Sequence, residues 1–259
     1  MTPTVPPFAQ LVAPQDWRAV DFISDLHLTP AQPATLAALQ RYLAGPRADA
    51  LFILGDFFEV WVGDDAADGD GFARDCAALL RSAARRTAVY FMHGNRDFLV
   101  GDAFLRLCHA TGLGDPTVLG FDGQRWLLTH GDALCLDDRD YMQFRRQVRT
   151  AQWRDEFLAR PLAQREAMAR QMRDASEQRK RSGADYADLN AEAVRQWLQA
   201  AQAAVMIHGH THKPATHELG AGLQRVVLSD WDGGATPPRQ QVLRLTRGQH
   251  AGPQRIELG

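Results

Sequence analysis

Residues that commonly bind metal ions follow five short apolar runs of the sequence. They lie in the segments Asp25-Leu26-His27, Gly55-Asp56, Gly94-Asn95, His130-Gly131-Asp132 and His208-Gly209-His210-Thr211-His212. Each segment alone is more often an ordinary turn, a capping aspartate or a structural histidine. Five of them in this order, each after a predicted strand, are hard to explain by structure alone. Because the carboxyl ends of strands in α/β proteins open onto one crevice, we expect these side chains to converge.

The donor types indicate which metal ions such a site would prefer. The predicted ligands comprise three carboxylate or amide oxygens and four imidazoles, a mixture that suits Mn²⁺, Fe or Zn²⁺ better than Mg²⁺. No cysteine is among them, which argues against a structural zinc site. Seven ligands are too many for one tetrahedral ion. They are enough for two ions about 3.5–4 Å apart that share a carboxylate and clamp a phosphoryl group.

Short apolar runs alternate with helical patterns, which predicts an α/β fold. The predicted strands are Ala19–Ile23, Ala50–Leu54, Ala88–Met92, Arg125–Thr129, Val205–Ile207, Val226–Leu228 and Gln241–Leu245. Helices are predicted over residues 34–44, 71–85, 102–110 and 187–202.

Composition limits the classes of function. The 259 residues carry a formal net charge of −2, which gives no general reason to expect a nucleic-acid partner. The three cysteines show no metal-site or disulfide spacing, so we expect reduced thiols. No run of eighteen apolar residues occurs, so no membrane span is predicted. Four prolines in the first sixteen residues predict a loose N-terminal tail over residues 1–16.

One segment differs from the rest in composition. Residues 139–181, here called the cap segment, hold 12 of the 29 basic residues and six acidic ones. Apolar residues at i,i+4 spacing predict two amphipathic helices that are broken near Pro161. The segment could be a helical hairpin packed on the core, or a cap over the active site. Its position between two groups of predicted ligands favours the cap, inserted into a core formed by residues 17–138 and 182–259.

The order of these motifs resembles that of the calcineurin-like metallophosphoesterases. The resemblance implies a four-layer α/β/β/α sandwich with the cap segment as a helical insertion. It also implies two metal ions with Asp56 as the shared ligand. One ion would be held by Asp25, His27, Asp56 and His210, and the other by Asp56, Asn95, His130 and His208.

Longer strings narrow the resemblance to one branch of this family. Residues 23–28, 55–65, 93–99 and 129–135 are similar to those of enzymes that cleave UDP-2,3-diacylglucosamine in the lipid A pathway. The resemblance implies UMP and a diacylated glucosamine 1-phosphate as products, two Mn²⁺ ions per chain and no nucleic acid. It also implies peripheral attachment to the anionic cytoplasmic face of the inner membrane, with acyl chains received by the cap segment.

The residue after Gly94-Asn95 supports this narrower match. Many relatives have a histidine there that can protonate an alkoxide leaving group, whereas this chain has Arg96, which cannot act as an acid at neutral pH. A phosphate monoester has a second pKa of about 6 and leaves without a proton. A fixed positive charge therefore suits diphosphate cleavage. The competing interpretation is an ion pair between Arg96 and neighbouring Asp97.

The resemblance also assigns contacts with the substrate. It places Asn95 and Arg96 at the reacting phosphates as the predicted catalytic residues. Further predicted substrate contacts are Asp138, Ser176, Lys180 and His208.

Three other functions are compatible with parts of the sequence. A phosphoesterase for nucleotides or cyclic nucleotides would share every metal ligand, but would have no use for an apolar, basic cap segment. A degenerate family member could serve as a binding scaffold, although all seven ligands are present. A nuclease would be expected to have a basic core, whereas the charge outside the cap segment is negative.

Overall fold

Two β-sheets packed face to face form the centre of the molecule. The computed structural model describes residues 5–45, 48–181, 188–248 and 252–258, and for residues 174–181 it describes the backbone alone. The first sheet has the strand order β12-β11-β2-β3-β4-β5 and the second has the order β1-β6-β7-β8-β10-β9.

The first sheet contains three of the predicted strands that precede ligand segments. Its strands are β2 (Ala19–Ile23), β3 (Ala50–Leu54), β4 (Ala88–Met92), β5 (Thr111–Leu113), β11 (Gln241–Thr246) and β12 (Gln254–Glu257). The central strands β2, β3 and β4 are parallel, and β3 is buried along its whole length. A continuous apolar run is what a parallel strand covered on both faces requires.

The second sheet carries the other two ligand segments. Its strands are β1 (Ala9–Val12), β6 (Thr117–Phe121), β7 (Gln124–Thr129), β8 (Val205–His208), β9 (Ala215–Gly220) and β10 (Leu223–Val227). Strands β7, β8 and β10 are parallel to one another. The ends of β7 and β8 therefore lie at the same edge of this sheet.

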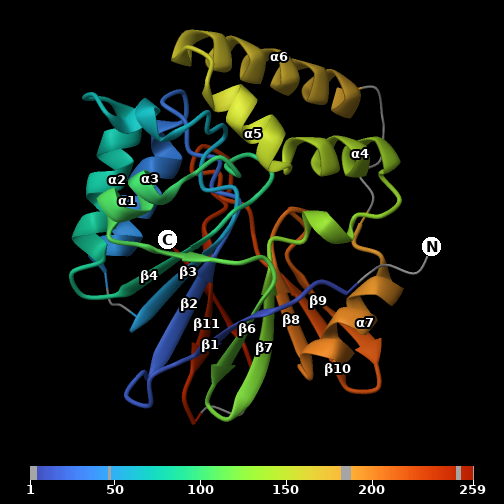
Figure 1. Ribbon diagram of the computed structural model, residues 1–259. Coiled ribbons are helices and arrows are strands. Elements are labelled where there is room, and N and C mark those ends of the chain that lie inside the picture. The colour runs from blue at the N-terminus through green and yellow to red at the C-terminus, as the bar shows by residue number, and fades with distance from the viewer. Residues whose placement is uncertain (1–4, 46–47, 182–187, 249–251, 259) are drawn as a thin grey trace.

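Helices cover the outer faces of both sheets, as Figure 1 shows. One layer consists of α1 (Pro33–Ala44), α2 (Phe72–Ala83) and α3 (Asp102–Cys108), and the opposite layer is α7 (Ala191–Ala201). Between the sheets, Phe52 stacks on Phe22 and Tyr90 with ring centroids 5.1 and 4.8 Å apart. The predicted four-layer sandwich is confirmed.

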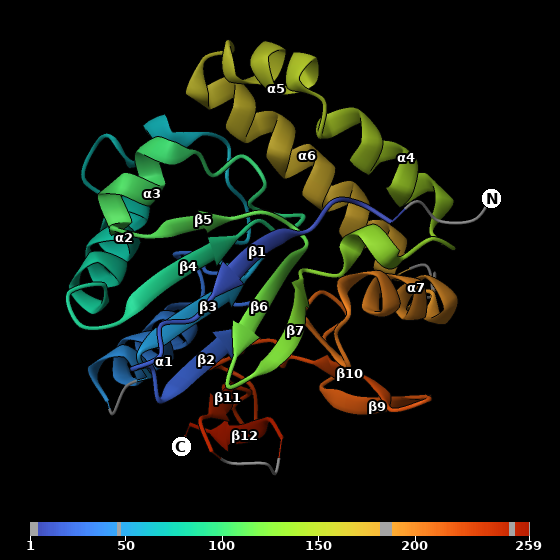
Figure 2. The same ribbon diagram turned by 60° about the horizontal axis from the view of Figure 1, so that its bottom comes forward.

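Three helices of the cap segment lie across one end of the sandwich (Figures 1 and 2). They are α4 (Arg139–Val148), α5 (Ala151–Leu158) and α6 (Leu162–Arg181). Arg165 of α6 is almost fully buried and donates to Asp65 and to the carbonyl oxygen of Val62. This arginine ties the cap segment to η1 (Asp64–Ala67), a 3-10 helix of the core.

Two of the predicted elements differ from the structure. The cap segment contains three helices rather than two, because the chain also breaks after Val148, where the Thr150 hydroxyl accepts from Trp153 N and caps α5. Within the predicted tail, Ala9–Val12 forms strand β1, parallel to β6. Prolines flank this edge strand without interrupting it, so the ladder keeps its donors.

The remaining predictions from composition concern cysteines and membrane spans. Cys76, Cys108 and Cys135 are free thiols, and all three are buried. No helix among the described residues has the length and apolar character needed to cross a bilayer.

Candidate metal centre

Six of the seven predicted ligands lie in loops that follow β2, β3, β4, β7 and β8, and His208 is the last residue of β8. Five residues of these loops adopt positive φ angles between 48° and 70°: Asp25, His27, Asp56, His210 and His212. This backbone conformation is uncommon outside glycine and costs on the order of 1–3 kcal/mol per residue. Its concentration here indicates that the loops are bent to direct their side chains into a common site.

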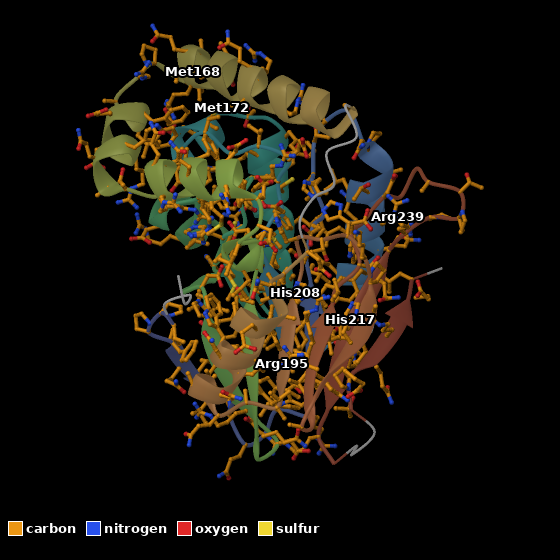
Figure 3. All side chains as sticks on the ribbon, turned by 90° about the vertical axis from the view of Figure 1, so that its right-hand side faces the viewer. Met168, Met172, Arg195, His208, His217 and Arg239 are labelled. Carbon is orange, nitrogen blue, oxygen red and sulfur yellow. The ribbon has the colours of Figure 1, made fainter. Side chains whose placement is uncertain are left out.

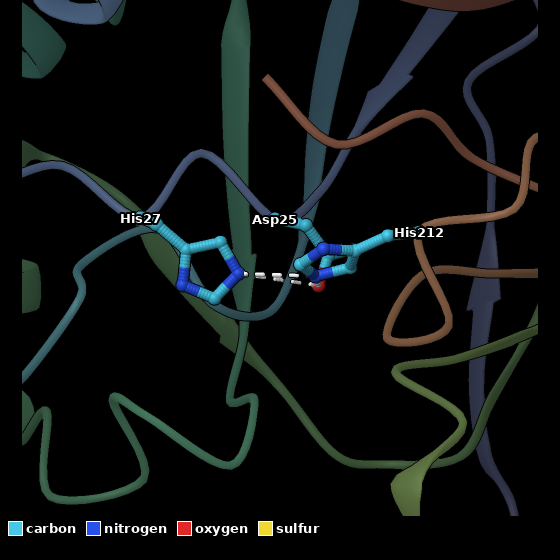
Figure 4. A group of neighbouring side chains, drawn as sticks. All are labelled: Asp25, His27 and His212. Carbon is cyan, nitrogen blue, oxygen red and sulfur yellow. Dashed lines mark hydrogen bonds and ion pairs between the residues drawn. The ribbon is translucent and has the colours of Figure 1, made fainter. Parts of the chain in front are cut away.

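The first cluster consists of Asp25, His27 and His212 (Figure 4). The Nε2 atom of His212 lies 3.2 Å from Asp25 Oδ1 and 3.2 Å from His27 Nε2. The other carboxylate oxygen of Asp25 accepts from the Ser24 hydroxyl at 2.6 Å and from His210 N at 2.8 Å. One oxygen of Asp25 is therefore held by the protein, while the other faces two imidazoles.

The second cluster consists of Asn95, His130 and His210. The Oδ1 atom of Asn95 lies 3.0 Å from His130 Nε2 and 2.8 Å from His210 Nδ1. His130 is fully buried, and its Nδ1 donates to the carbonyl oxygen of Leu54 at 2.9 Å. In the neutral ring its Nε2 therefore carries a lone pair directed at the Asn95 oxygen.

Asp56 lies between the two clusters. Its Oδ2 is 3.9 Å from His27 Nε2, and its Oδ1 is 3.7 Å from His130 Nε2. The same Oδ1 accepts from Arg96 N at 2.8 Å. A carboxylate with one oxygen toward each cluster has the placement required of a ligand shared by two ions.

Asp97 holds the loops that carry Asp56 and Asn95. This buried carboxylate accepts from Phe57 N at 2.7 Å and from Gly94 N at 2.8 Å. Burial, followed by the charge of Asp56, raises the pKa of Asp97. Gly94 lies so close that a Cβ there would collide with the carboxylate and backbone nitrogen of Asp56. The glycine is required by this close approach of the two loops.

The donor set fits metal ions. In the second cluster an imidazole lone pair faces an amide oxygen, and two such acceptors at 3.0 Å need a cation or a proton between them. Burial alone would lower the pKa of His130, but the carboxylates of Asp56, Asp25 and Asp132 raise it to about 9. In the first cluster, His27 Nδ1 lies 3.0 Å from Glu59, which leaves Nε2 for a metal ion.

The side chain of His208 lies outside the two clusters described above, and its buried Nε2 has no hydrogen-bond partner among the described residues. Met206 packs with α7 and Ile207 packs between the sheets, so alternation along β8 directs His208 toward α7. Its Nδ1 lies 2.7 Å from the Gly209 carbonyl oxygen. Burial, with a contribution from Arg225, lowers the pKa of His208 to about 3. Figure 3 shows His208 at the end of the sheet, below the helix that carries Met168 and Met172.

His212, which was not among the predicted ligands, occupies the place expected for His210. His210 in turn occupies the place expected for His208, next to Asn95 and His130. The signal was present in the five-residue segment with three histidines. Of these three histidines, His210 and His212 lie in the clusters, while His208 is the last residue of β8.

Arg96 lies at the edge of the centre. Its Nη1 is 3.8 Å from Glu59 Oε1, while Asp97 is directed to backbone amides. The ion pair considered between Arg96 and Asp97 is therefore replaced by a looser contact with Glu59. Glu59 thus contacts both His27 and Arg96, a role that the sequence did not reveal.

A cavity of about 1020 Å³ opens above the two clusters. Its polar lining includes His27, Asp56, Asn95, Arg96, Asp138, His210 and His212. Its apolar lining includes Val60, Trp61, Phe98, Phe144, Trp153, Phe157 and Met172. Asp138 also accepts from Tyr141 N at 3.0 Å and caps α4. The side chains of Ser176 and Lys180 fall outside the described part of the structure.

The chain is similar to known phosphoesterases over most of its length. Residues 19–214 match the family model described as calcineurin-like phosphoesterase. The chain is 47% identical over 242 residues to the UDP-2,3-diacylglucosamine hydrolase of Ralstonia nicotianae, covering 88% of this chain and 90% of that protein. It is 46% identical over 225 residues to the protein of that name from Chromobacterium violaceum, covering 83% and 92%. The corresponding Pseudomonas aeruginosa protein is 44% identical over 221 residues, covering 83% and 91%.

Whether His212 or His208 helps to hold an ion can be tested by measuring metal content. We expect His212→Ala to retain one Mn²⁺ where the unchanged protein retains two, because the first cluster loses an imidazole. His208→Ala should lower the melting temperature through the cavity it creates, yet keep both ions. Elemental analysis after loading and desalting measures the stoichiometry. Loss of an ion from His208→Ala, with both kept in His212→Ala, would instead support the ligand role that the sequence predicts for His208.

Proposed function

The chain belongs to the calcineurin-like phosphoesterase family, and we propose that it hydrolyses UDP-2,3-diacylglucosamine to UMP and 2,3-diacylglucosamine 1-phosphate. Relatives with this substrate in their name match more than four fifths of the chain. The observation that carries the proposal is the cavity, which joins a metal-ligand floor to apolar walls. A nucleotide phosphoesterase would need the metal-ligand residues but not the apolar walls of the cavity.

The walls suit a substrate with hydrocarbon chains. Trp153 stacks on Phe157 with ring centroids 4.8 Å apart, and Phe98 lies 6.0 Å from Trp153. Enclosing an acyl chain contributes about 0.8 kcal/mol for each buried CH₂. Acyl chains against these rings would therefore supply most of the affinity, while the phosphates face the metal centre.

Calcineurin-like phosphoesterases use a dinuclear metal centre, and we propose two Mn²⁺ ions for this chain. Asp25, His27 and His212 would hold one ion, Asn95, His130 and His210 the other, and Asp56 would bridge them. When bound, such a pair supplies a hydroxide nucleophile at neutral pH and neutralises phosphoryl oxygens. Mixed oxygen and imidazole donors favour Mn²⁺ over Mg²⁺.

The protein's own part is to orient the diphosphate and stabilise its charge. Arg96 carries a permanent positive charge at the edge of the centre, and Glu59 restrains its guanidinium. The leaving phosphate monoester needs no proton at pH 7, because its second pKa is about 6. Arg96 therefore stabilises the departing negative charge without transferring a proton. Asn95, which we propose as a metal ligand, would in addition contact the reacting phosphate.

Further contacts are proposed for the sugar and for the membrane. Asp138 lines the cavity and could accept from a sugar hydroxyl, and Ser176 and Lys180 of α6 remain candidates near the phosphates. Exposed Phe144, Leu158 and Met172 lie in the arginine-rich cap segment. This combination suits an anionic bilayer surface, so we propose peripheral binding at the cytoplasmic face of the inner membrane.

The reaction itself is tested with the lipid substrate in ¹⁸O-labelled water. We expect phosphorus NMR to detect UMP and the lipid 1-phosphate, with the label in one product and no inorganic phosphate. Cyclic nucleotides and simple phosphomonoesters serve as the comparison substrates. Faster hydrolysis of either than of the lipid diphosphate would refute the proposed substrate.

The role of Arg96 predicts a large loss of rate without loss of metal. Arg96→Ala should lower kcat by on the order of 10²–10³, the scale for removing one preorganised charge contact. Metal content should not change, because Arg96 contacts Asp56 only through its backbone N. Steady-state kinetics and elemental analysis provide the two measurements. If Arg96→His were equally active on the diphosphate, permanent charge would not be what the reaction requires.

Acyl binding predicts a selective change in KM. Phe144→Ser and Met172→Ser should each raise KM for the diacylated substrate several-fold, because both residues line the cavity. Leu158→Ser is the matched control, since Leu158 is similarly exposed but is not among the lining residues. Assays in detergent micelles separate this effect from membrane binding. An equal rise in KM for all three variants would mean that the cavity does not hold the acyl chains.

A further inference from the structure

We propose that helix α4 is a positioning element for the second cluster, and that Arg149 and Arg145 transmit its position to the loops of Asn95 and His130. Arg145 lies in α4, and Arg149 is the residue that ends it. The inference rests on the proposed two-ion centre, because it concerns the side chains that would hold one of those ions.

Arg149 fixes the loop that carries Asn95. Its Nη2 donates to the carbonyl oxygen of Gly94 at 2.7 Å. That carbonyl belongs to the peptide group joining Gly94 to Asn95, so the bond sets the plane from which the Asn95 side chain projects. The other face of the same loop is held by Asp97, which accepts from Gly94 N. The loop is thus clamped between a core carboxylate and an arginine of the cap segment.

Arg145 fixes the loop that carries His130. It donates from Nε to Asp132 Oδ2 at 2.8 Å, and the Tyr141 hydroxyl donates to the same oxygen at 2.5 Å. Asp132 is fully buried two residues after His130, and Arg149 also lies 3.7 Å from it. A buried carboxylate with these charged partners is costly to displace. The turn that follows His130 is therefore held against α4.

The third ligand of the second cluster also faces this helix. The ring centroid of Tyr141 lies 6.1 Å from that of His210. Asn95, His130 and His210 come from three separate loops, and α4 contacts the loop or ring of each. The first cluster is supported from other directions, since Glu59 contacts His27 and Ser24 donates to Asp25. We therefore expect α4 to affect one ion and not the other.

Arg149 is itself held by the apolar wall of the cavity. Its guanidinium carbon lies 5.0 Å from the ring centroid of Phe98, a cation–π distance. Phe98 in turn contacts Trp153 of α5. The guanidinium thus contacts both the Phe98 ring and the Gly94 carbonyl, which restricts its direction.

The test compares two arginines of one helix turn. Arg149→Met removes the donor and keeps much of the chain length, and Arg146→Met is the control because Arg146 is exposed. Both changes are made in the His212→Ala background, which disables the first cluster, and metal-free protein is titrated with Mn²⁺ by calorimetry. We expect Arg149→Met to weaken Mn²⁺ binding about 10–100-fold, the range for loss of an outer partner of a metal ligand. Arg146→Met should bind as its parent does, and Arg149→Lys should recover part of the loss.

Activity provides a second readout in the otherwise unchanged protein. Arg149→Met should lower kcat more than it raises KM, and excess Mn²⁺ should restore part of the rate. Unchanged Mn²⁺ affinity in the Arg149→Met titration would overturn the proposal. An equal loss of affinity at both sites when Arg149→Met is titrated in the otherwise unchanged protein, together with a lower melting temperature, would also overturn it, because α4 would then only stabilise the fold. A different preferred substrate would refute the proposed function but would leave the Mn²⁺ titration, and hence this inference, intact.

Discussion

The burial of two neighbouring carboxylates, Asp25 and Asp56, determines how the loops around them are arranged. Both are almost fully inaccessible, and transferring a charged carboxylate from water into the interior costs several kcal/mol unless partners compensate. The compensation comes from loops far apart in sequence, which supply imidazoles, backbone amides and the Ser24 hydroxyl. Parallel strands in two stacked sheets bring these loops to one edge. The fold thus brings together the partners that compensate for the burial of both charges.

The strained loops show how that arrangement is maintained. Asp25, Asp56 and His212 have positive φ angles, which the chain would not adopt without opposing contacts. Asp97 supplies such contacts by accepting from the amides that flank Asp56 and Asn95. Asp97, which is not among the proposed metal ligands, thus helps to orient the residues that are. Such supporting residues give no separate motif, which explains why the sequence indicated the ligands but not their supports.

What the sequence could predict depends on whether a feature leaves a local pattern of residue types. Strands with continuous apolar runs, such as Ala50–Leu54, were predicted correctly because burial on both faces leaves a clear pattern. Asp25, His27, Asp56, Asn95 and His130 all follow strand ends, and the structure brings their side chains together. The sequence could not show where β8 ends among the three histidines, and pairing of His208 with Thr129 makes His208 the last residue of that strand. Strand β1 was missed because its stability comes from pairing with β6 rather than from its own composition.

The cap segment is joined to the metal centre more closely than its place as an insertion suggests. An insertion that only covered a cavity could contact the core at its rim. Here Arg165 reaches a core carbonyl on one side, and Arg149 reaches the carbonyl that precedes Asn95 on the other. Arginine suits both positions, because its planar fork can donate to a carbonyl while its face lies against an aromatic ring. A lysine could satisfy the carbonyl but could not span to the Phe98 ring in the same way. Inward arginines of the cap segment thus hold the loops of the candidate site, while its exposed arginines belong to the surface for which we propose membrane binding.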